Sequence, residues 1–169
     1  MKHWKSICVY VCALIGIVIL GFAAIKSINL NQDCVGHLKR AADANTIELA
    51  QKELSTAISY LEENNMTEGY TSVIYKTPDE DVKFFYDNLV ASQKELNDVM
   101  KNSDQLTTTN TLMKLRETLT DTNSDGKTVV TRPDGLQYFP NNVGWAIART
   151  LASIALLAGA ILAMIQLKL

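Results

Sequence analysis

Residues 7–25 read ICVYVCALIGIVILGFAAI and contain no charged side chain. As a helix with a rise of about 1.5 Å per residue, this segment reaches roughly 28 Å, which is close to the thickness of the hydrocarbon core of a bilayer. Residues 150–167, TLASIALLAGAILAMIQL, form a second uncharged run. Its apolar character extends back to Val143, past Arg149, whose long side chain can reach the headgroups. The sequence therefore predicts transmembrane helices at residues 7–25 and 143–167.

The first apolar run has an alternative interpretation as a cleaved signal peptide. Lys2 and Lys5 provide a basic leader, and Gly21-Phe22-Ala23 is an acceptable cleavage site of small residues. The run is longer than the apolar part of a signal peptide, which usually has about 7 to 15 residues. We therefore expect an uncleaved anchor, and in either interpretation the segment that follows lies outside the cytoplasm.

Charge is distributed unevenly along the chain. All 18 Asp and Glu residues lie between the two apolar runs with 13 of the 16 Lys and Arg residues, so the middle carries a net charge of −5. The other three are Lys2, Lys5 and Lys168. Because basic residues in short end segments favour the cytoplasmic side, we expect an inner-membrane protein with both termini in the cytoplasm and an acidic extracytoplasmic domain. An acidic domain argues against nucleic-acid binding, which requires a basic surface.

These expectations divide the chain into five segments. The predicted organisation is a cytoplasmic N-terminus at 1–6, a transmembrane helix at 7–25, an extracytoplasmic domain at 26–142, a second transmembrane helix at 143–167 and a cytoplasmic C-terminus at 168–169. Small residues recur at four-residue spacing in both helices, which places each set on one face where two helices can approach closely in lipid. The alternative is that Ala and Gly are simply common in such helices. The predicted packing residues are Cys12, Gly16, Ala155, Gly159 and Ala163.

Capping signals and apolar periodicity predict several helices in the domain. Asp33 is expected to cap a helix that ends near Ala44. Asn45 with Glu48 has the pattern of a capping box for a helix that reaches about Glu63. The predicted buried stripe of this second helix is Ile47, Ala50, Leu54, Ala57 or Ile58, and Leu61.

The clearest helix start is Thr77-Pro78-Asp79-Glu80, with a hydroxyl cap, a proline at the first helical position and acidic groups at the positive end of the helix dipole. This helix is expected to reach about Asn102, and a third segment is expected after a threonine-rich break at residues 107–109. The predicted stripes are Val82, Phe85, Leu89, Leu96, Val99 and Met100, then Leu112, Leu115 and Leu119. Amphipathic helices bury such stripes by packing together, so the predicted fold is mainly α, an antiparallel helical bundle.

Two stretches favour β structure instead of helix. Residues 70–75 are rich in β-branched and aromatic residues, and residues 127–132 and 136–139 flank a Pro133-Asp134-Gly135 turn. We expect a small β-hairpin element around this turn. Residues 70–75 either pair with the hairpin or form an extended loop.

The pattern Asp121-x-Asn123-x-Asp125-Gly126 matches the first half of a calcium-binding loop. The match ends there, because the twelfth position holds Arg132 where a bidentate glutamate would complete the site. A polar turn built for ordinary backbone reasons accounts for the same residues. We therefore expect a turn, with a calcium site as the alternative, and no cofactor.

Cys34 is the one cysteine in the predicted extracytoplasmic domain. A lone thiol in an oxidising compartment either links two chains through a disulfide or stays buried, and the sequence leaves both open. Cys34 and His37 have the spacing of half a zinc site, but the other histidine is His3, on the far side of the predicted membrane. A zinc site is therefore not predicted.

Aromatic residues gather around the centre of the domain. Phe84-Phe85-Tyr86 are consecutive, so they cannot all face one core from a single helix. Because exposed aromatic side chains mark contact surfaces, we predict an interaction surface here, with packing of the turn against the bundle as the alternative. The predicted interaction residues are Tyr70, Tyr75, Phe84 and Tyr86.

Motifs for catalysis are not readable from the sequence. The middle shows no Ser-His-Asp or Cys-His arrangement and no glycine-rich phosphate loop, and the acidic cluster at residues 79–81 is explained by a helix start. The predicted function is a non-enzymatic, two-pass membrane protein that serves as an interaction, scaffold or accessory subunit. Its expected partners are membrane lipid and either another membrane or extracytoplasmic protein or a second copy. The alternative is a ligand- or ion-sensing module.

Overall fold

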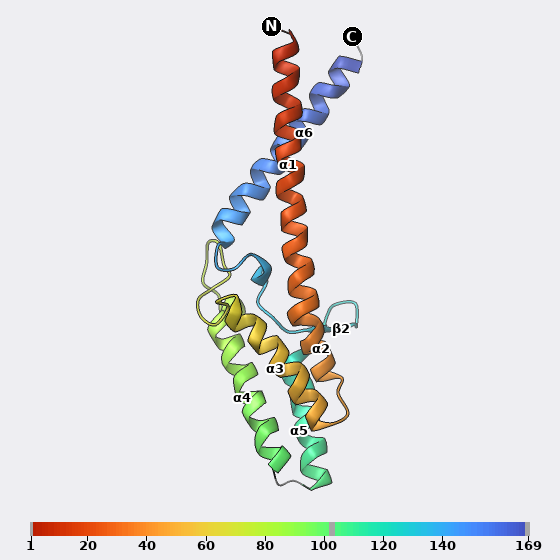
Figure 1. The fold of residues 1–169 in the computed structure, drawn as a ribbon, viewed down its shortest axis with the longest axis vertical. Helices are drawn as coiled ribbons and strands as arrows, with labels where there is room; N and C mark the ends of the chain where they lie inside the picture. Colours follow the sequence, from red (N-terminus) through yellow and green to blue (C-terminus); the bar gives the residue numbers. More distant parts are fainter. Residues whose placement is uncertain (1, 102–103, 168–169) are drawn as a thin grey trace. The chain divides into compact units, whose positions relative to one another are not determined.

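The computed structural model of the chain describes residues 2–101 and 104–167, without the side chains of residues 2–6, 8, 9, 166 and 167. The fold is mainly α with one small antiparallel β-hairpin, as predicted (Figure 1). It divides into two compact units, Met1–Ser27 with Asn141–Leu169, and Ile28–Pro140. The elements are α1 (Lys2–Leu30), the π-helical turn η1 (Asn31–Val35), α2 (Gly36–Ala42), α3 (Ile47–Glu63), the 3₁₀ turn η2 (Pro78–Glu80), α4 (Val82–Lys101), α5 (Gln105–Leu119), β1 (Thr120–Thr122), β2 (Thr128–Val130), the 3₁₀ turn η3 (Leu136–Tyr138) and α6 (Asn142–Leu167).

The first unit consists of two long apolar helices, most of α1 and all of α6. Both are long and apolar enough to cross a membrane, although a signal sequence near an N-terminus has the same properties. Their large apolar side chains are mostly exposed, among them Leu14 and Leu157, at 63% and 65%. A soluble helix buries one apolar face, so this all-round exposure suits a lipid environment.

The two helices of this unit touch at Gly16. A Cβ atom at this position would lie 3.1 Å from the carbonyl oxygen of Ala152 and 3.2 Å from Cγ of Leu156. Gly16 was among the predicted packing residues, but its contacts on α6 are Ala152 and Leu156. The other predicted packing residues are half-buried (Ala155 and Gly159) or exposed (Cys12 and Ala163).

Helix α1 continues through η1 into α2, so the prediction that Asp33 caps a new helix is wrong. The residues before η1 and α2 have helical backbone angles and no side-chain cap. Gly36 N–H donates to the carbonyl of Asn31, five residues back, which is the bond of a π turn. A Cβ at Gly36 would lie 2.9 Å from that same oxygen. Glycine therefore allows the wide turn, and the helix needs no break there.

Helix α3 matches its prediction closely, with a cap one residue later than expected. Leu49 N–H donates to Thr46 Oγ1 at 3.3 Å, so Thr46 caps the helix instead of Asn45. The whole predicted stripe is buried: Ile47, Ala50, Leu54, Ala57, Ile58 and Leu61.

The segment between α3 and α4 is an extended loop, so the alternative given for residues 70–75 is confirmed and the strand prediction is wrong. Tyr70 forms a single antiparallel bridge with Asp81. This bridge fixes Asp81 in an extended conformation, which ends η2 and delays α4 until Val82. The predicted start at residues 77–80 is thus only a 3₁₀ turn. Asp81 caps α4, because its Oδ1 accepts from Phe84 N–H at 3.1 Å.

Helices α4 and α5 carry most of their predicted stripes inward, but Met100 is 48% exposed and its predicted burial is wrong. The predicted break at residues 107–109 is also wrong. Helix α5 starts at Gln105, where Asp104 Oδ1 accepts from Thr107 N–H at 2.7 Å. The next two threonines are helical, and their hydroxyls donate to carbonyls one turn back within the same helix.

The hairpin pairs β1 with β2, with Asp121 opposite Val129. The hairpin was predicted around residues 133–135, but its turn lies earlier, at residues 123–127. The segment after Gly135 forms η3 instead of a strand. Gly126 has a φ of +74°, which a residue with a side chain adopts at a cost. The polar residues assigned to a turn therefore close this hairpin.

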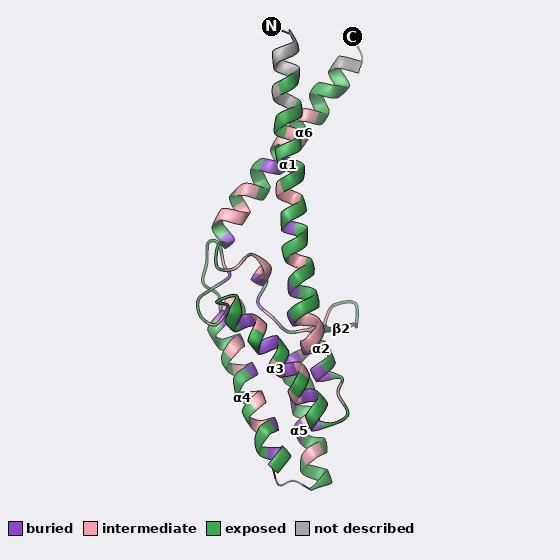
Figure 2. Ribbon diagram, viewed as in Figure 1, coloured by how far each residue is buried: buried purple, intermediate pink, exposed green. Residues whose placement is uncertain are grey.

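Helices α2, α3, α4 and α5 form an antiparallel bundle within the second unit. α3 packs against α2 and α4, and α5 packs against both α2 and α4. Figure 2 shows the buried positions of these helices facing one another. The largest fully buried side chains are Leu30, Leu38, Leu54, Leu61, Leu89, Leu96, Leu119, Leu136, Val82 and Cys34. The second unit therefore has its own hydrophobic core.

Candidate binding pocket

A pocket of about 310 Å³ lies where three segments of the second unit meet. It is lined by η2 and the first turns of α4, by the last residues of α5, and by residues 131–133 after the hairpin. Each segment is held by contacts described above, including the Tyr70–Asp81 bridge and the cap at Asp81. The pocket therefore has walls from regular structure on two sides.

Apolar side chains form the floor of this pocket, and an aromatic ring forms its rim. Leu89 and Leu119, each 1% exposed, belong to the hydrophobic core and close the pocket from below. Phe84 is 65% exposed, while its neighbour Phe85 is buried at 8%. A ring this exposed beside an apolar hollow has surface to offer a partner.

Arg132 supplies the buried cationic group of the pocket. Its side chain is partly buried, and its Nη1 atom is buried and makes no hydrogen bond to any residue that the structure describes. A buried guanidinium nitrogen without an acceptor is costly to the fold. Asp81 also lines the pocket, but its carboxylate is already used as a helix cap. The pocket thus combines an apolar floor with an arginine side chain on its wall.

The four predicted interaction residues lie in two parts of the second unit, the loop before η2 and the start of α4. Phe84 lies on the pocket rim, and Tyr70 and Tyr75 belong to the extended loop, with exposures of 37% and 75%. Tyr86 is half-buried, and its hydroxyl donates to Glu62 Oε1 at 2.7 Å. This hydrogen bond, followed by burial, raises the pKa of Tyr86. Tyr86 therefore joins α4 to α3. For this residue the contact corresponds to packing within the bundle, which was the alternative to an interaction surface.

Cys34 lies in η1 with an exposure of 0%. Burial raises the pKa of the thiol to about 12, and the positive charge of Arg132 opposes this rise only in part. A disulfide between two chains requires an accessible thiolate. The structure gives the buried alternative and places the thiol out of reach of a second chain.

In the loop at residues 121–126, side-chain oxygens of Asp121 and Asn123 accept hydrogen bonds from nearby backbone N–H groups. Asn123 Oδ1 accepts from Asp125 N–H at 3.1 Å and from Lys127 N–H at 2.9 Å. Asp121 Oδ1 accepts from Thr122 N–H at 2.6 Å. Among the side chains that the structure describes, no three from His, Cys, Asp or Glu stand close enough to hold a metal ion. These contacts describe a hairpin turn.

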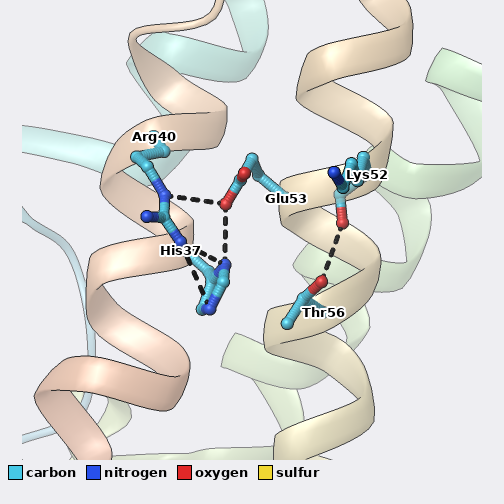
Figure 3. Close-up of polar contacts among 5 residues, drawn as sticks. All are labelled: His37, Arg40, Lys52, Glu53 and Thr56. Carbon is cyan, nitrogen blue, oxygen red and sulfur yellow. Dashed lines mark hydrogen bonds and ion pairs between the residues drawn. The ribbon is translucent and has the colours of Figure 1, made fainter.

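A polar cluster that the sequence analysis did not find joins α2 to α3 (Figure 3). Glu53 Oε2 lies 2.6 Å from His37 Nδ1 and accepts from Arg40 Nε at 2.8 Å. Burial acts to raise the pKa of Glu53, but hydrogen bonds and charge from His37 and Arg40 outweigh it and lower the pKa. Beside it Thr56 Oγ1 donates to the carbonyl of Lys52 at 3.1 Å, within α3. We call the contacts among His37, Arg40 and Glu53 the clasp, because they join α2 to α3.

Sequence signals for the pocket and for the polar cluster between α2 and α3 were only weak. In the sequence, Arg132 was notable only because it occupies the position where a calcium loop needs a glutamate. It lies near the start of α4 because the hairpin closes earlier in the chain than predicted. His37 and Arg40 are three residues apart, which places them on one helix face, but their partner Glu53 lies on another helix. Comparisons with protein family models, with curated proteins and with solved structures find no match for this chain.

Proposed function

We propose that this chain is a two-pass inner-membrane protein with both termini in the cytoplasm and residues 26–142 outside. The proposal is supported by two helices of 29 and 26 residues whose apolar side chains are mostly exposed. It is also supported by the charge distribution, since every carboxylate lies between the two apolar runs. The bundle buries its own core and so gives the protein a folded domain that does not depend on lipid for burial.

We further propose that this domain is a non-enzymatic interaction module of an accessory or scaffold subunit, and that a partner protein binds at the pocket. The observation that carries this proposal is the exposed Phe84 ring beside the apolar floor of a pocket that Arg132 also lines. A partner with an apolar side chain next to a carboxylate would cover the ring and place a negative charge near the Arg132 guanidinium. Aromatic and arginine residues are the types that dominate binding at such interfaces.

The size of the expected effect can be stated for each residue. Removing an interfacial aromatic anchor costs about 2 kcal/mol or more of binding free energy, a factor of roughly 30 in Kd. A hydrogen bond to a charged group contributes about 1.5–3 kcal/mol. Phe84→Ala and Arg132→Gln should therefore each release most of a bound partner at the dilution of a purification.

The experiment is extraction of the full chain, tagged after Leu169, from native membranes in mild detergent. We expect a stoichiometric partner with the wild type that is lost with Phe84→Ala and Arg132→Gln. Met113→Ala is the matched control, because Met113 is 57% exposed on α5 and lies outside the pocket. Equal recovery of the partner with all variants would contradict the pocket as its site. A dimer that only the pocket variants dissolve would identify the partner as a second copy.

The pocket also supports a second candidate, a ligand-sensing module. A volume of about 310 Å³ is at the lower end of the range for small-molecule sites, which is about 300–1,000 Å³. A medium-chain fatty acid has the required apolar tail and carboxylate, so it should raise the unfolding temperature of the wild type and leave Arg132→Gln unchanged. A shift produced by calcium and lost in Asp125→Ala would instead favour the ion-sensing alternative.

A further inference from the structure

The loop between α3 and α4 exposes three consecutive apolar side chains, Val73, Ile74 and Tyr75. Their exposures are 48%, 80% and 75%. We name these three residues the apolar tip. Ile74 is the most exposed large apolar side chain that the structure describes. An exposed run of this kind marks a surface that meets another apolar phase.

The tip projects from a loop whose base is fixed. Thr71 N–H donates to the Glu80 carbonyl at 3.0 Å, and Val82 N–H donates to the Gly69 carbonyl at 2.9 Å. With the Tyr70–Asp81 bridge, these bonds join the two ends of the loop as a short antiparallel ladder. The base holds the tip outward although the tip itself makes no regular structure.

Contacts within the second unit place this loop at one end of the bundle. A Cβ atom at Gly69 would lie 3.2 Å from the ring of Phe139, so the loop base lies against the residue next to Pro140, where the unit ends. Helix α3, which leads into the loop, packs against η1, the turn that follows α1. The loop therefore belongs to the end of the bundle from which the chain continues into both apolar helices.

The chemistry of the tip fits a bilayer surface better than water. Residues 72–76 read SVIYK and contain no carboxylate in a domain that is otherwise acidic. Tyrosine is favoured at the boundary between hydrocarbon and headgroups, where its ring is buried and its hydroxyl stays wet. Lys76 follows with its Nζ 5.4 Å from the centre of the Tyr70 ring. A basic residue beside apolar ones suits the headgroup layer, which often carries negative charge.

We propose that the apolar tip inserts into the outer interface of the bilayer that the two apolar helices cross. This inference rests on the proposed membrane topology. The tip would give the bundle a third contact with the membrane, besides its two covalent connections, and would restrict its rotation above the lipid. The occupant of this surface is therefore lipid headgroups and the adjoining acyl chains.

The test uses nitroxide labels on single cysteines in the full chain reconstituted into phosphatidylcholine vesicles that contain some phosphatidylglycerol. Cys8→Ala and Cys12→Ala form the background, and Cys34 stays because it is 0% exposed. The labelled variants are Ile74→Cys, Leu106→Cys and Val18→Cys. Leu106 is the matched control, since it is 69% exposed at the opposite end of the bundle, in the first turn of α5. Collision rates are measured with oxygen, which concentrates in lipid, and with a water-soluble nickel chelate.

We expect the Ile74 label to collide several-fold less often with the nickel chelate, and more often with oxygen, than the Leu106 label. Equal nickel collision rates at Ile74 and Leu106 would overturn the inference. Protection of the Ile74 label from both reagents would also overturn it, because that result indicates contact with protein. The Val18 label separates the two failures: if it behaves as a lipid-buried site, the topology stands while the tip inference falls, and if it behaves as a water-exposed site, both fall.

Discussion

Helices α3 and α6 are both rich in apolar residues, but they present them differently. In α3, Leu54 and Leu61 are fully buried on one face and the opposite face is polar. In α6, Leu157 and Ile161 remain more than half exposed, and no charged residue follows Arg149 within its described side chains. The difference shows that apolar periodicity indicates packing against protein, whereas apolar composition without periodicity indicates a helix that needs another solvent.

The largest expected effect is a difference in bundle stability between two leucine-to-alanine variants, one in α3 and one in α6. Leu54→Ala removes a fully buried side chain and should lower the free energy of unfolding of the bundle by about 2–5 kcal/mol. Leu157→Ala makes the same chemical change on an exposed position and should leave bundle unfolding unchanged. Urea unfolding of the full chain in detergent, followed by circular dichroism, measures both. Equal destabilisation would mean that α6 is packed like a core helix.

A second comparison concerns two glycines, Gly21 in α1 and Gly36 at the start of α2. Gly36→Ala places a methyl group 2.9 Å from the Asn31 carbonyl and should destabilise the bundle by about 1–3 kcal/mol, as overpacking does. Gly21→Ala is the control, because nothing lies within 4 Å of the added atom. The same unfolding experiment applies. A Gly36→Ala variant as stable as the wild type would show that η1 converts to an ordinary helix without cost.

The clasp between α2 and α3 predicts a dependence of stability on pH. Because the folded-state pKa of Glu53 is lowered, its contribution is present above its usual pKa of 4.5 and is lost as the pH falls through the lower, folded value. The difference in unfolding free energy between the wild type and Glu53→Gln should thus shrink as the pH falls below 4.5. Stability curves measured from pH 7 downward test this. A difference that stays the same below pH 4.5 would contradict the assignment.

The smallest effect is expected at Cys34. Its thiol is buried and its pKa is raised, so it should not react with a maleimide until the bundle unfolds. The chain should therefore migrate at the same position with and without reductant when Cys8 and Cys12 are replaced by alanine. A dimer that reductant separates in that background would show that the thiol is accessible.

The helices and most of the core could be predicted because their signals are local. The stripe of α3 follows from spacing alone, and five of the six stripe positions of α4 are buried as expected. Cap positions were shifted where several polar residues compete, as at Asn45 and Thr46. A new helix start was predicted at Asp33, but the helix continues there through a π turn at Gly36. The periodic pattern of apolar residues does not mark such a turn.

The pocket could not be predicted because its residues are distant in the sequence. Phe84 was identified as an exposed aromatic residue from the crowding of three aromatics on one helix. Arg132 comes close to the start of α4 because the hairpin closes at residues 123–127 and not at the predicted turn at residues 133–135. Thr131 N–H donates to the carbonyl of Leu119 at the end of α5, and the sequence carries no signal for this contact.

The most direct test of the central claim is the accessibility of the bundle and of the C-terminus in intact cells. In the Cys8→Ala, Cys12→Ala background, a membrane-impermeant maleimide is applied to Leu106→Cys, and an epitope tag after Leu169 is exposed to protease. We predict that Leu106→Cys is labelled in intact cells after removal of any outer barrier, while the tag is degraded only after the membrane is opened. Labelling of Leu106→Cys only after opening, or release of the chain from membranes at alkaline pH, would contradict the two-pass topology.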